Sequence, residues 1–221
     1  MGQVPSTLHF YVRSVPTISV GYFQKIGESV NLEECERRGV SIVRRKSGGS
    51  SIYTDRGQLI YGLVLSEHDL PEERADSFRI ICQAIADALR LLGVDATYRP
   101  MNDVEVGGRK VSGNAQFRRK GSVLQHGTVI VDTDVKLMDA VLKMNRTRKS
   151  ELSRPSDRVT TLANLLGSVP DMKAVKSSIA SAFERTFDVE FTTSEITASE
   201  VSVVRKLVDE RYSRKEWNLK F

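Results

Sequence analysis

The chain has 221 residues, 40% of them hydrophobic and 28% charged, so it can bury a sizeable core as one large domain. No segment approaches the roughly 18 consecutive apolar residues that a membrane-spanning helix needs, and the first six residues lack a signal-peptide core. Two cysteines, Cys35 and Cys82, do not make a disulfide framework. We therefore expect a cytoplasmic protein with no membrane partner.

The net charge is +5, but the basic residues are dispersed. Short basic runs occur only at residues 44–46, 118–120 and 146–149. No helix-turn-helix, zinc-finger or aromatic RNA-binding signature accompanies them, so the pattern does not favour nucleic acid as a partner. The excess charge suits a phosphate-bearing small ligand or an acidic protein partner equally well.

Hydrophobic periodicity and turn residues in the first hundred positions predict alternating strands and helices. The expected strands cover residues 8–12, 18–23, 40–43, 59–65 and 96–98, and the expected helices cover 31–39 and 71–92. Asn31 is the predicted N-cap of the first helix, and Gly39 ends it. The strand at 59–65 is apolar on both faces, which predicts a central position in a sheet. Cys82 falls on the apolar face of the long helix, so we expect it in the core.

The stretch from Asn102 to Asp132 predicts three strands joined by two tight turns. The first turn is Gly107-Gly108 and the second lies at 119–121, closed by a glycine. Helices are expected over 134–142, 160–166, 170–187 and 198–211, with a strand at 189–192. Between them, the polar segment 143–159 is long for a compact connection and is a candidate lid. Trp217, the only tryptophan, is expected to fasten the C-terminal segment to the core.

Lys110 lies between the two turns and precedes the small residues Ser112, Gly113 and Ala115. Small residues after a lysine let the backbone approach a ligand closely while the ammonium reaches a phosphate or a carboxylate. The alternative is a solvated lysine on an edge strand.

A second stretch, residues 44–53, reads R-R-K-S-G-G-S-S-I-Y. Arginines beside glycines and hydroxyls offer fork-shaped donors and exposed backbone N–H groups, which suit an anion. The pattern is neither a Walker loop nor G-x-G-x-x-G. A glycine turn with a solvated basic shoulder is the alternative.

Further blocks accompany these two stretches in a fixed order. They are residues 16–24, Asp55, Asn102-Asp103, His126-Gly127-Thr128 and the terminal residues 212–213 and 216–218. Together, the blocks resemble the catalytic domain of lipoate-protein ligase A and its biotin/lipoate ligase relatives. The resemblance covers nearly the whole chain, and the order of several independent blocks makes it more specific than either stretch alone.

The resemblance implies an α/β fold with a mixed, largely antiparallel sheet flanked by helices. It also implies a two-step reaction, in which lipoate and Mg-ATP give lipoyl-adenylate and the lipoyl group then passes to a lysine of a carrier. The carrier is a lipoyl domain of a 2-oxoacid dehydrogenase acyltransferase subunit or a glycine-cleavage H protein. Lys110 is the implied catalytic cation, bridging the lipoyl carboxylate and the α-phosphate.

The resemblance implies that ATP and lipoyl-adenylate are bound by Arg45, Ser47, Gly48, Gly49, Ser50, Ser51, Ile52, Tyr53, Asn102, Asp103, Lys110, Gly113, Ala115 and His126. Asp103 is the implied ligand of the Mg²⁺ that accompanies ATP. No metal-ligand motif such as C-x-x-C or H-E-x-x-H occurs, so we do not expect a dedicated metal site.

The chain departs from the family pattern in three respects. Ser50 replaces a third glycine and Thr54 replaces a histidine; a serine at positive φ would be strained and would weaken adenylate binding. The family's first strand and helix are largely absent. Residues 1–221 are expected to form a single catalytic domain without the family's C-terminal accessory domain, which some archaeal-type ligases supply as a separate small subunit.

Three functions compete. The first is an ATP-dependent lipoate ligase subunit. The second is a lipoyl or octanoyl transferase that takes a pre-activated acyl group through a covalent cysteine, which requires an activated thiolate near the lysine. The third is a non-catalytic homologue that binds lipoyl domains or adenylate. Biotin ligation is disfavoured because the loop of the type G-R-G-R-x-G is missing.

Overall fold

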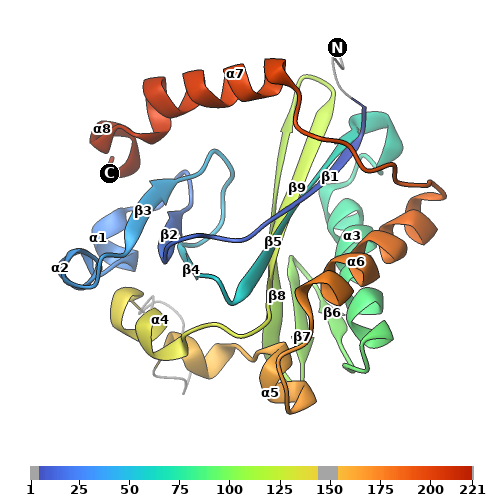
Figure 1. Cartoon of the computed structure of the whole chain (residues 1–221), viewed down its shortest axis with the longest axis horizontal. Coiled ribbons are helices and arrows are strands. Elements are labelled where there is room, and N and C mark those ends of the chain that lie inside the picture. The colour runs from blue at the N-terminus through green and yellow to red at the C-terminus, as the bar shows by residue number, and fades with distance from the viewer. Residues whose placement is uncertain (1–4, 144–153, 221) are drawn as a thin grey trace.

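The computed structural model describes residues 5–143 and 154–220, and two sheets organise it (Figure 1). The larger sheet has six antiparallel strands. In spatial order they are β1 (Thr7–Tyr11), β5 (Gln58–Ser66), β9 (Ser122–Ile130), β8 (Arg109–Arg119), β7 (Asp103–Val106) and β6 (Thr97–Arg99). The smaller sheet has β2 (Thr17–Val20) in the middle, parallel to β3 (Ser41–Arg44) and antiparallel to β4 (Ile52–Thr54). The expected mixed and largely antiparallel fold is confirmed.

Glycine turns set the register of β7, β8 and β9, as the sequence predicts. Gly107 and Gly108 both have positive φ, 56° and 76°, and join β7 to β8. Lys120 and Gly121, at φ 53° and 76°, join β8 to β9. Glycine adopts these angles without steric cost, so the turns fix which residues of β8 and β9 face each other.

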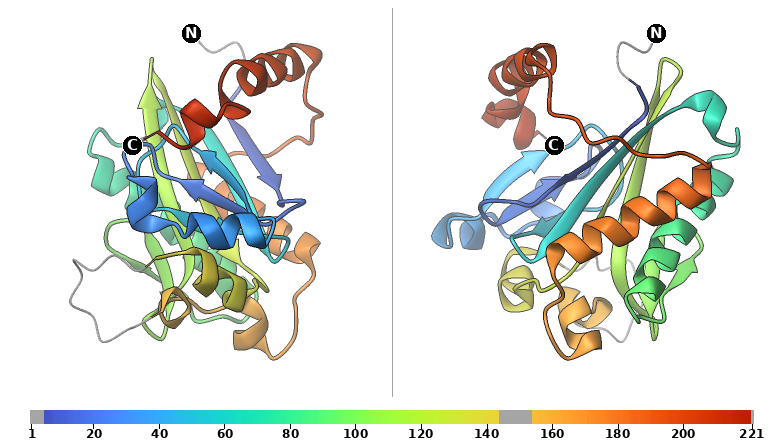
Figure 2. Two further views of the ribbon diagram at one scale, coloured as in Figure 1. Left: turned by 90° about the vertical axis from the view of Figure 1, so that its left-hand side faces the viewer. Right: turned by 45° about the vertical axis from the view of Figure 1, so that its right-hand side comes forward.

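The long helices cover one face of the six-stranded sheet. They are α3 (Arg74–Leu91) and α6 (Met172–Phe187), which pack against each other and against β5 and β9 (Figure 2). Leu59, Tyr61 and Leu63 point into this core, which also contains Cys82. Because side chains alternate along a strand, the intervening residues of β5 and β9 face the opposite side of the sheet.

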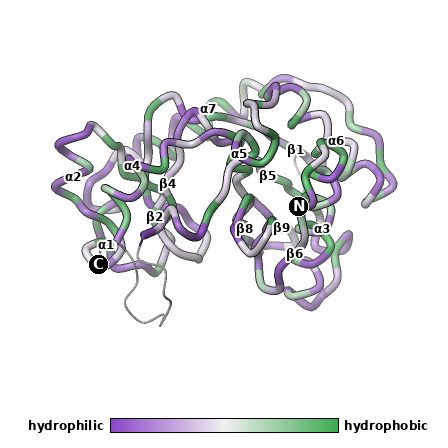
Figure 3. The backbone as a smooth tube through the Cα atoms, turned by 90° about the horizontal axis from the view of Figure 1, so that it is seen from below, coloured by the Kyte–Doolittle hydropathy of each residue, from purple (hydrophilic) through white to green (hydrophobic). Residues whose placement is uncertain are grey.

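A second core lies beside the first, under the smaller sheet. It is built from Ile18, Val20, Cys35, Tyr53 and Val141 with their neighbours. The short helices around it are α1 (Ile26–Ser29), α2 (Leu32–Arg37) and α4 (Val135–Val141). Figure 3 shows this group and the α3–α6 group as two neighbouring parts of the chain.

Side chains cap the short helices around the second core, at Asn31 as predicted and also at Asp134. The Asn31 side chain accepts a hydrogen bond from the Glu34 N–H at the start of α2, and Asp134 does the same for the Leu137 N–H at the start of α4. The remaining elements are η1 (Glu67–Asp69), η2 (Pro155–Arg158), α5 (Leu162–Leu166), α7 (Ala198–Leu207), the π-helical turn η3 (Val208–Tyr212) and α8 (Lys215–Asn218).

Three predictions about elements were wrong in detail. The predicted strand at 189–192 does not form: the Glu184 main-chain oxygen and carboxylate accept the N–H groups of Val189 and Phe191, so the segment is anchored to α6 without a partner strand. By contrast, β5 is an interior strand, paired with β1 and β9, as predicted. The strand β2 ends at Val20, because Gly21 and Tyr22 contact the glycine-rich loop that follows β3. The final helix ends at Leu207 and continues as the π-helical turn.

Part of the predicted lid, residues 144–153, lies outside the described residues. The described part, around η2, bonds to the Lys110 strand, where the Thr160 N–H donates to the Lys110 carbonyl at 2.8 Å. Within the described residues, no helix combines the length and the apolar character needed to cross a membrane.

Candidate functional site

Two adjoining cavities lie on the side of β8 and β9 that faces the smaller sheet. One, of about 370 Å³, contains Lys110, and we call it the lysine cavity. The other, of about 510 Å³, has several aromatic walls, and we call it the aromatic cavity. The two share Gly49, Phe78, Asn102, Asn114 and Ala115. They therefore meet at the middle of β8 and can hold two parts of one ligand.

Lys110 and Asp103 form an ion pair on one wall of the lysine cavity. The Lys110 Nζ lies 2.9 Å from the Asp103 Oδ1, and the lysine side chain remains 35% exposed. A Cβ on Gly113 would lie 3.4 Å from the lysine Cδ and 3.6 Å from its Nζ. These are ordinary van der Waals distances, so Gly113 packs directly against the lysine side chain.

A buried hydrogen-bond network fixes the chain where the cavities meet. The Asn114 side-chain amide donates to the Asn102 carbonyl at 2.9 Å, and its oxygen accepts the Tyr61 hydroxyl at 2.6 Å. A Cβ on Gly127 would lie 2.1 Å from that Asn114 oxygen and 2.7 Å from the Tyr61 ring. Only glycine fits there, so Gly127 permits this network.

Arg45 holds the glycine-rich loop that follows β3. Its guanidinium donates to the carbonyls of Ser19, Gly48 and Ser50, at 2.7 to 3.2 Å. Burial lowers the pKa of Arg45 to about 10. Because the guanidinium donates to main-chain oxygens, Arg45 fixes the conformation of this loop beside the cavities.

Two glycines allow the tight folding of this loop. Gly49 has φ 93°, and a Cβ there would lie 2.9 Å from an Arg45 nitrogen. A Cβ on Gly21 would lie 1.9 Å from the Gly49 oxygen, and the Tyr22 N–H donates to the Ser47 carbonyl at 3.0 Å. This close crossing explains why β2 ends at Val20.

His126 ties the loop to the larger sheet. Its Nε2 lies 2.6 Å from the Ser47 hydroxyl, which is buried. Burial and then the charge of Arg45 lower the pKa of His126 to about 4, so the imidazole is neutral at pH 7. A neutral imidazole nitrogen can accept a hydrogen bond from the Ser47 hydroxyl without adding a charge to the cavity.

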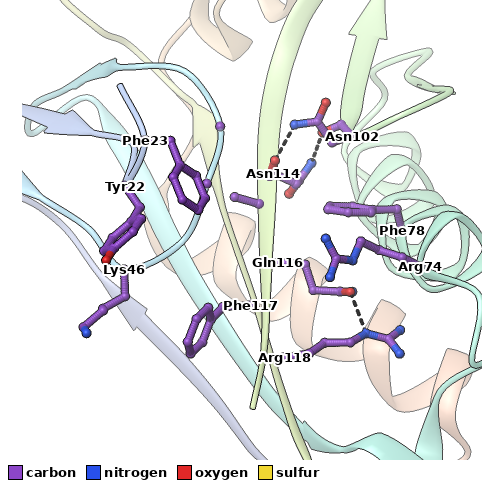
Figure 4. A pocket seen from close by; sticks show the side chains of 13 residues that line it. Tyr22, Phe23, Lys46, Arg74, Phe78, Asn102, Asn114, Gln116, Phe117 and Arg118 are labelled. Atoms are coloured by element: carbon purple, nitrogen blue, oxygen red, sulfur yellow. Dashed lines mark hydrogen bonds between the residues drawn. The ribbon is translucent and has the colours of Figure 1, made fainter. Parts of the chain in front are cut away.

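Side chains from three parts of the fold build the aromatic cavity (Figure 4). They come from α3 (Arg74, Phe78), from β8 (Gln116, Phe117, Arg118) and from the loops beside the smaller sheet (Tyr22, Phe23, Lys46). The Gln116 amide is fixed on both sides, since its oxygen accepts the Arg118 Nε at 3.0 Å and its nitrogen donates to Gln125 at 3.1 Å. The cavity thus offers flat apolar walls and a few oriented polar groups, which is typical of a small-molecule site.

Most of the predicted site residues line one of the two cavities. Those that do are Arg45, Gly48, Gly49, Ser50, Ile52, Asn102, Asp103, Lys110, Gly113, Ala115 and His126. Ser47 bonds to His126 behind the wall, Ser51 bonds to the Ser29 hydroxyl, and Tyr53 lies in the second core. These three therefore support the site without lining it.

The two departures from the family pattern cause no backbone strain. Ser50 is not among the residues with positive φ in the described chain, so its Cβ is tolerated. Thr54 is buried, and its hydroxyl donates to the Thr17 carbonyl at 3.1 Å within the smaller sheet.

Arg13 is the main cavity residue that no pattern in the sequence indicated. It lines the lysine cavity beside Tyr11, with its guanidinium 5.4 Å from the centre of the Tyr11 ring. Its Nε is buried and has no hydrogen-bond partner among the described residues. A lone arginine after a strand carries no motif, so only the fold reveals that it faces the cavity.

Neither cysteine reaches either cavity. Cys35 lies in the second core, and Cys82 is fully buried in the first. The Cys82 sulfur is 3.9 Å from the amide nitrogen of Gln125. The Gln125 side chain in turn bonds to Gln116 in the cavity wall, so it lies between Cys82 and the cavity. Burial raises the pKa of Cys82 to about 12, so its thiol stays protonated at neutral pH.

Asp103 is the only carboxylate among the described residues that line the two cavities. No group of three or more His, Cys, Asp or Glu side chains suited to a metal ion occurs in the described part of the chain. One carboxylate fits a Mg²⁺ ion that takes its other ligands from substrate phosphates and water, rather than a preformed protein cage.

The two sheets and the two adjoining cavities beside Lys110 define a mixed α/β domain with a small-molecule site. Residues 1–184 match the family model described as "Lipoyl protein ligase A/B catalytic domain". The chain belongs to this family.

Solved structures resemble the chain over almost its whole length. A crystal structure of lipoate-protein ligase A bound with ATP matches with a TM-score of 0.87 and 30% identity, over 98% of this chain and 87% of that one. A structure from a study of a bi-partite lipoate protein ligase and its E2 lipoyl domain from Thermoplasma acidophilum matches with a TM-score of 0.86 and 31% identity, over 98% of this chain and 85% of that one.

Curated relatives carry two different activities. An octanoyltransferase, LipM, from Halalkalibacterium halodurans is 32% identical, over 99% of this chain and 89% of its own length. Subunit 1 of the lipoate-protein ligase A from Thermoplasma acidophilum is also 32% identical, over 96% and 84%. Sequence identity alone therefore does not separate ligase from transferase.

Proposed function

We propose that this chain is the catalytic subunit of a lipoate-protein ligase, which activates lipoate with ATP and transfers the lipoyl group to a lysine of a lipoyl domain. One observation carries the choice: Lys110 faces the cavity while both thiols are buried away from it. An acyl-adenylate is already activated, so transfer from it needs a positioned cation and no nucleophilic side chain.

In the first step, a lipoate carboxylate oxygen attacks the α-phosphorus of ATP and pyrophosphate leaves. Both reactants are anionic, so their approach requires nearby positive charge. The Lys110 ammonium can leave Asp103 to meet these oxygens, and Arg13 offers a guanidinium nitrogen that lacks an acceptor. Such fixed charges stabilise the transition state because they need no reorganisation when the charge develops.

Mg²⁺, when bound with ATP, would neutralise phosphate oxygens, and Asp103 is the residue that would hold it on the protein side. In the second step, the neutral amine of the carrier lysine attacks the acyl carbonyl carbon and AMP leaves. Lys110 remains beside the departing phosphate throughout, so it serves both steps.

A second candidate is an octanoyltransferase that accepts a pre-activated acyl group, as the names of several curated relatives suggest. In its thioester form, this reaction needs a reactive thiolate. Cys82 would have to leave a core in which its pKa is raised to about 12, and Cys35 lies under the other sheet. The positions of the cysteines favour the adenylate route.

The two candidates differ in the donor that supports acylation. The experiment incubates the purified chain and an unmodified lipoyl domain with either ATP and lipoate, lipoyl-adenylate, or an octanoyl thioester of an acyl carrier protein. Lipoylation from the adenylate, together with an intact protein mass showing no acyl-cysteine, is the expected result. Acylation from the thioester alone, with an acyl-cysteine intermediate, would replace the ligase by the transferase.

A further inference from the structure

Four basic side chains from three distant segments gather beside the aromatic cavity. Lys46 follows β3, Arg119 ends β8, and Arg211 and Lys220 belong to the C-terminal segment. The Lys46 Nζ, the Arg211 Cζ and the Lys220 Nζ lie 5.2, 5.1 and 4.3 Å from the centre of the Trp217 ring. We call these four residues the basic rim.

Three members of the basic rim, Lys46, Arg119 and Arg211, have no close carboxylate among the described residues. Burial, and then the charge of Arg211, lower the pKa of Lys46, and Arg119 and Lys220 act in the same direction. No ion pair within 4.0 Å joins Lys46, Arg119 or Arg211 to a carboxylate of the described residues. Clustered like charges cost free energy, which a negatively charged partner would recover.

An exposed aromatic residue stands next to the rim. Phe23 is 78% exposed although it packs edge-on against Tyr22, with ring centres 4.8 Å apart. It lines the mouth of the aromatic cavity together with Lys46 (Figure 4). An exposed aromatic residue surrounded by cations matches the composition of protein–protein hot spots, in which aromatic and arginine side chains dominate.

We propose that Phe23 and the basic rim form the docking surface for the acidic face of the carrier domain that presents the acceptor lysine. This inference rests on the proposed function. Docking beside the mouth of the aromatic cavity would direct the lysine toward an acyl group held where the two cavities meet. The rim would speed encounter through complementary charge, and Phe23 would supply apolar contact.

The test reverses the charge of the two rim arginines, neither of which lines a cavity, in the double variant Arg119→Glu/Arg211→Glu. With supplied lipoyl-adenylate, we expect the KM for an unmodified lipoyl domain to rise at least about tenfold. The rate with hydroxylamine, a small amine that needs no docking, should stay within about twofold of wild type, and so should the melting temperature. Added salt should raise the wild-type KM and have less effect on the variant.

The matched control is Lys173→Glu/Arg185→Glu, which makes the same change in net charge on exposed positions of α6. Its KM for the lipoyl domain should match wild type. An unchanged KM in the rim variant, or an equal loss with hydroxylamine, would overturn the docking assignment. Should the wild-type chain transfer no acyl group at all, the proposed function fails, and calorimetric binding of the lipoyl domain to wild type and variant still decides the docking surface.

Discussion

Lys110 lies in the wall of the lysine cavity, where its ammonium pairs with the Asp103 carboxylate at 2.9 Å. We predict that Lys110→Ala lowers the rate of lipoyl-adenylate formation by about two to three decades, the usual loss when one preorganised charge is removed. Pyrophosphate release on adding ATP and lipoate measures this rate. Arg109→Ala, an exposed neighbour on the same strand, is the control and should retain the wild-type rate. A Lys110→Ala variant with near-normal turnover would remove Lys110 from the central role.

His126 is kept neutral by its surroundings, and this has a consequence for stability. Its pKa is about 4 in the folded protein against an ordinary value of 6.5, so the unfolded chain binds more protons between these values. The free energy of unfolding should therefore fall as the pH drops from about 7 to about 4, by up to about 3 kcal/mol from this residue. Urea unfolding across this range measures it. His126→Gln should flatten the slope; an identical slope in the variant would contradict the assignment.

Single residues differ in how far the sequence alone determines their roles. Lys110 and Gly113 stand out in the sequence because a lysine followed by small residues is a local pattern, and the structure places both in the lining of the lysine cavity. The part played by Arg45 was not, since its three carbonyl acceptors come together only when the loop folds over Gly21. Arg13 has no local signal at all, because its place in the cavity depends on the pairing of β1 with β5.

The same distinction holds for whole elements. The turns at 107–108 and 119–121 were predicted correctly because glycine's backbone freedom is a local property. The strand expected at 189–192 was wrong because a strand needs a partner, and Val189 and Phe191 bond to Glu184 instead. The interior place expected for β5 was correct, since apolar residues on both faces indicate burial, but they do not give the order of the strands.

The short helix α8 holds the glycine-rich loop from outside. The Asn218 side chain accepts the Arg44 N–H at 3.0 Å and donates to the Tyr212 carbonyl at 2.8 Å, and the Trp217 indole donates to the Arg44 carbonyl at 2.9 Å. We predict that Asn218→Ala destabilises the fold by about 1–3 kcal/mol, because it leaves a buried N–H without an acceptor.

The same variant should loosen the loop next to Arg44. Hydrogen exchange of the amides at 46–51 is expected to be faster in Asn218→Ala than in wild type. Lys215→Ala, an exposed position on the same helix, is the control and should not change it. Equal exchange in all three proteins would show that α8 does not support the loop.

At the scale of the whole molecule, the two half-reactions place different demands on the chain. Adenylation requires lipoate, ATP and metal to be aligned for in-line attack, whereas transfer requires only a lysine amine beside an activated carbonyl. The similar ligase from Thermoplasma acidophilum is bi-partite. We predict that the purified chain transfers lipoate from supplied lipoyl-adenylate faster than it forms the adenylate from ATP. Both rates are measured on the same preparation; adenylation at the full rate of transfer would make the chain self-sufficient.

The bonds around Arg44 also bear on the order in which the protein matures during synthesis. Arg44 donates to main-chain oxygens at 21, 22 and 24, but its own N–H and its second guanidinium nitrogen bond to Asn218 and Lys220, more than 170 positions later. A ribosome making roughly 5–20 residues per second reaches those positions about ten or more seconds after Arg44 is made. During that interval the second core, whose buried members end at Val141, can form while the glycine-rich loop lacks its outer support. The second core should therefore form before α8 fixes the loop.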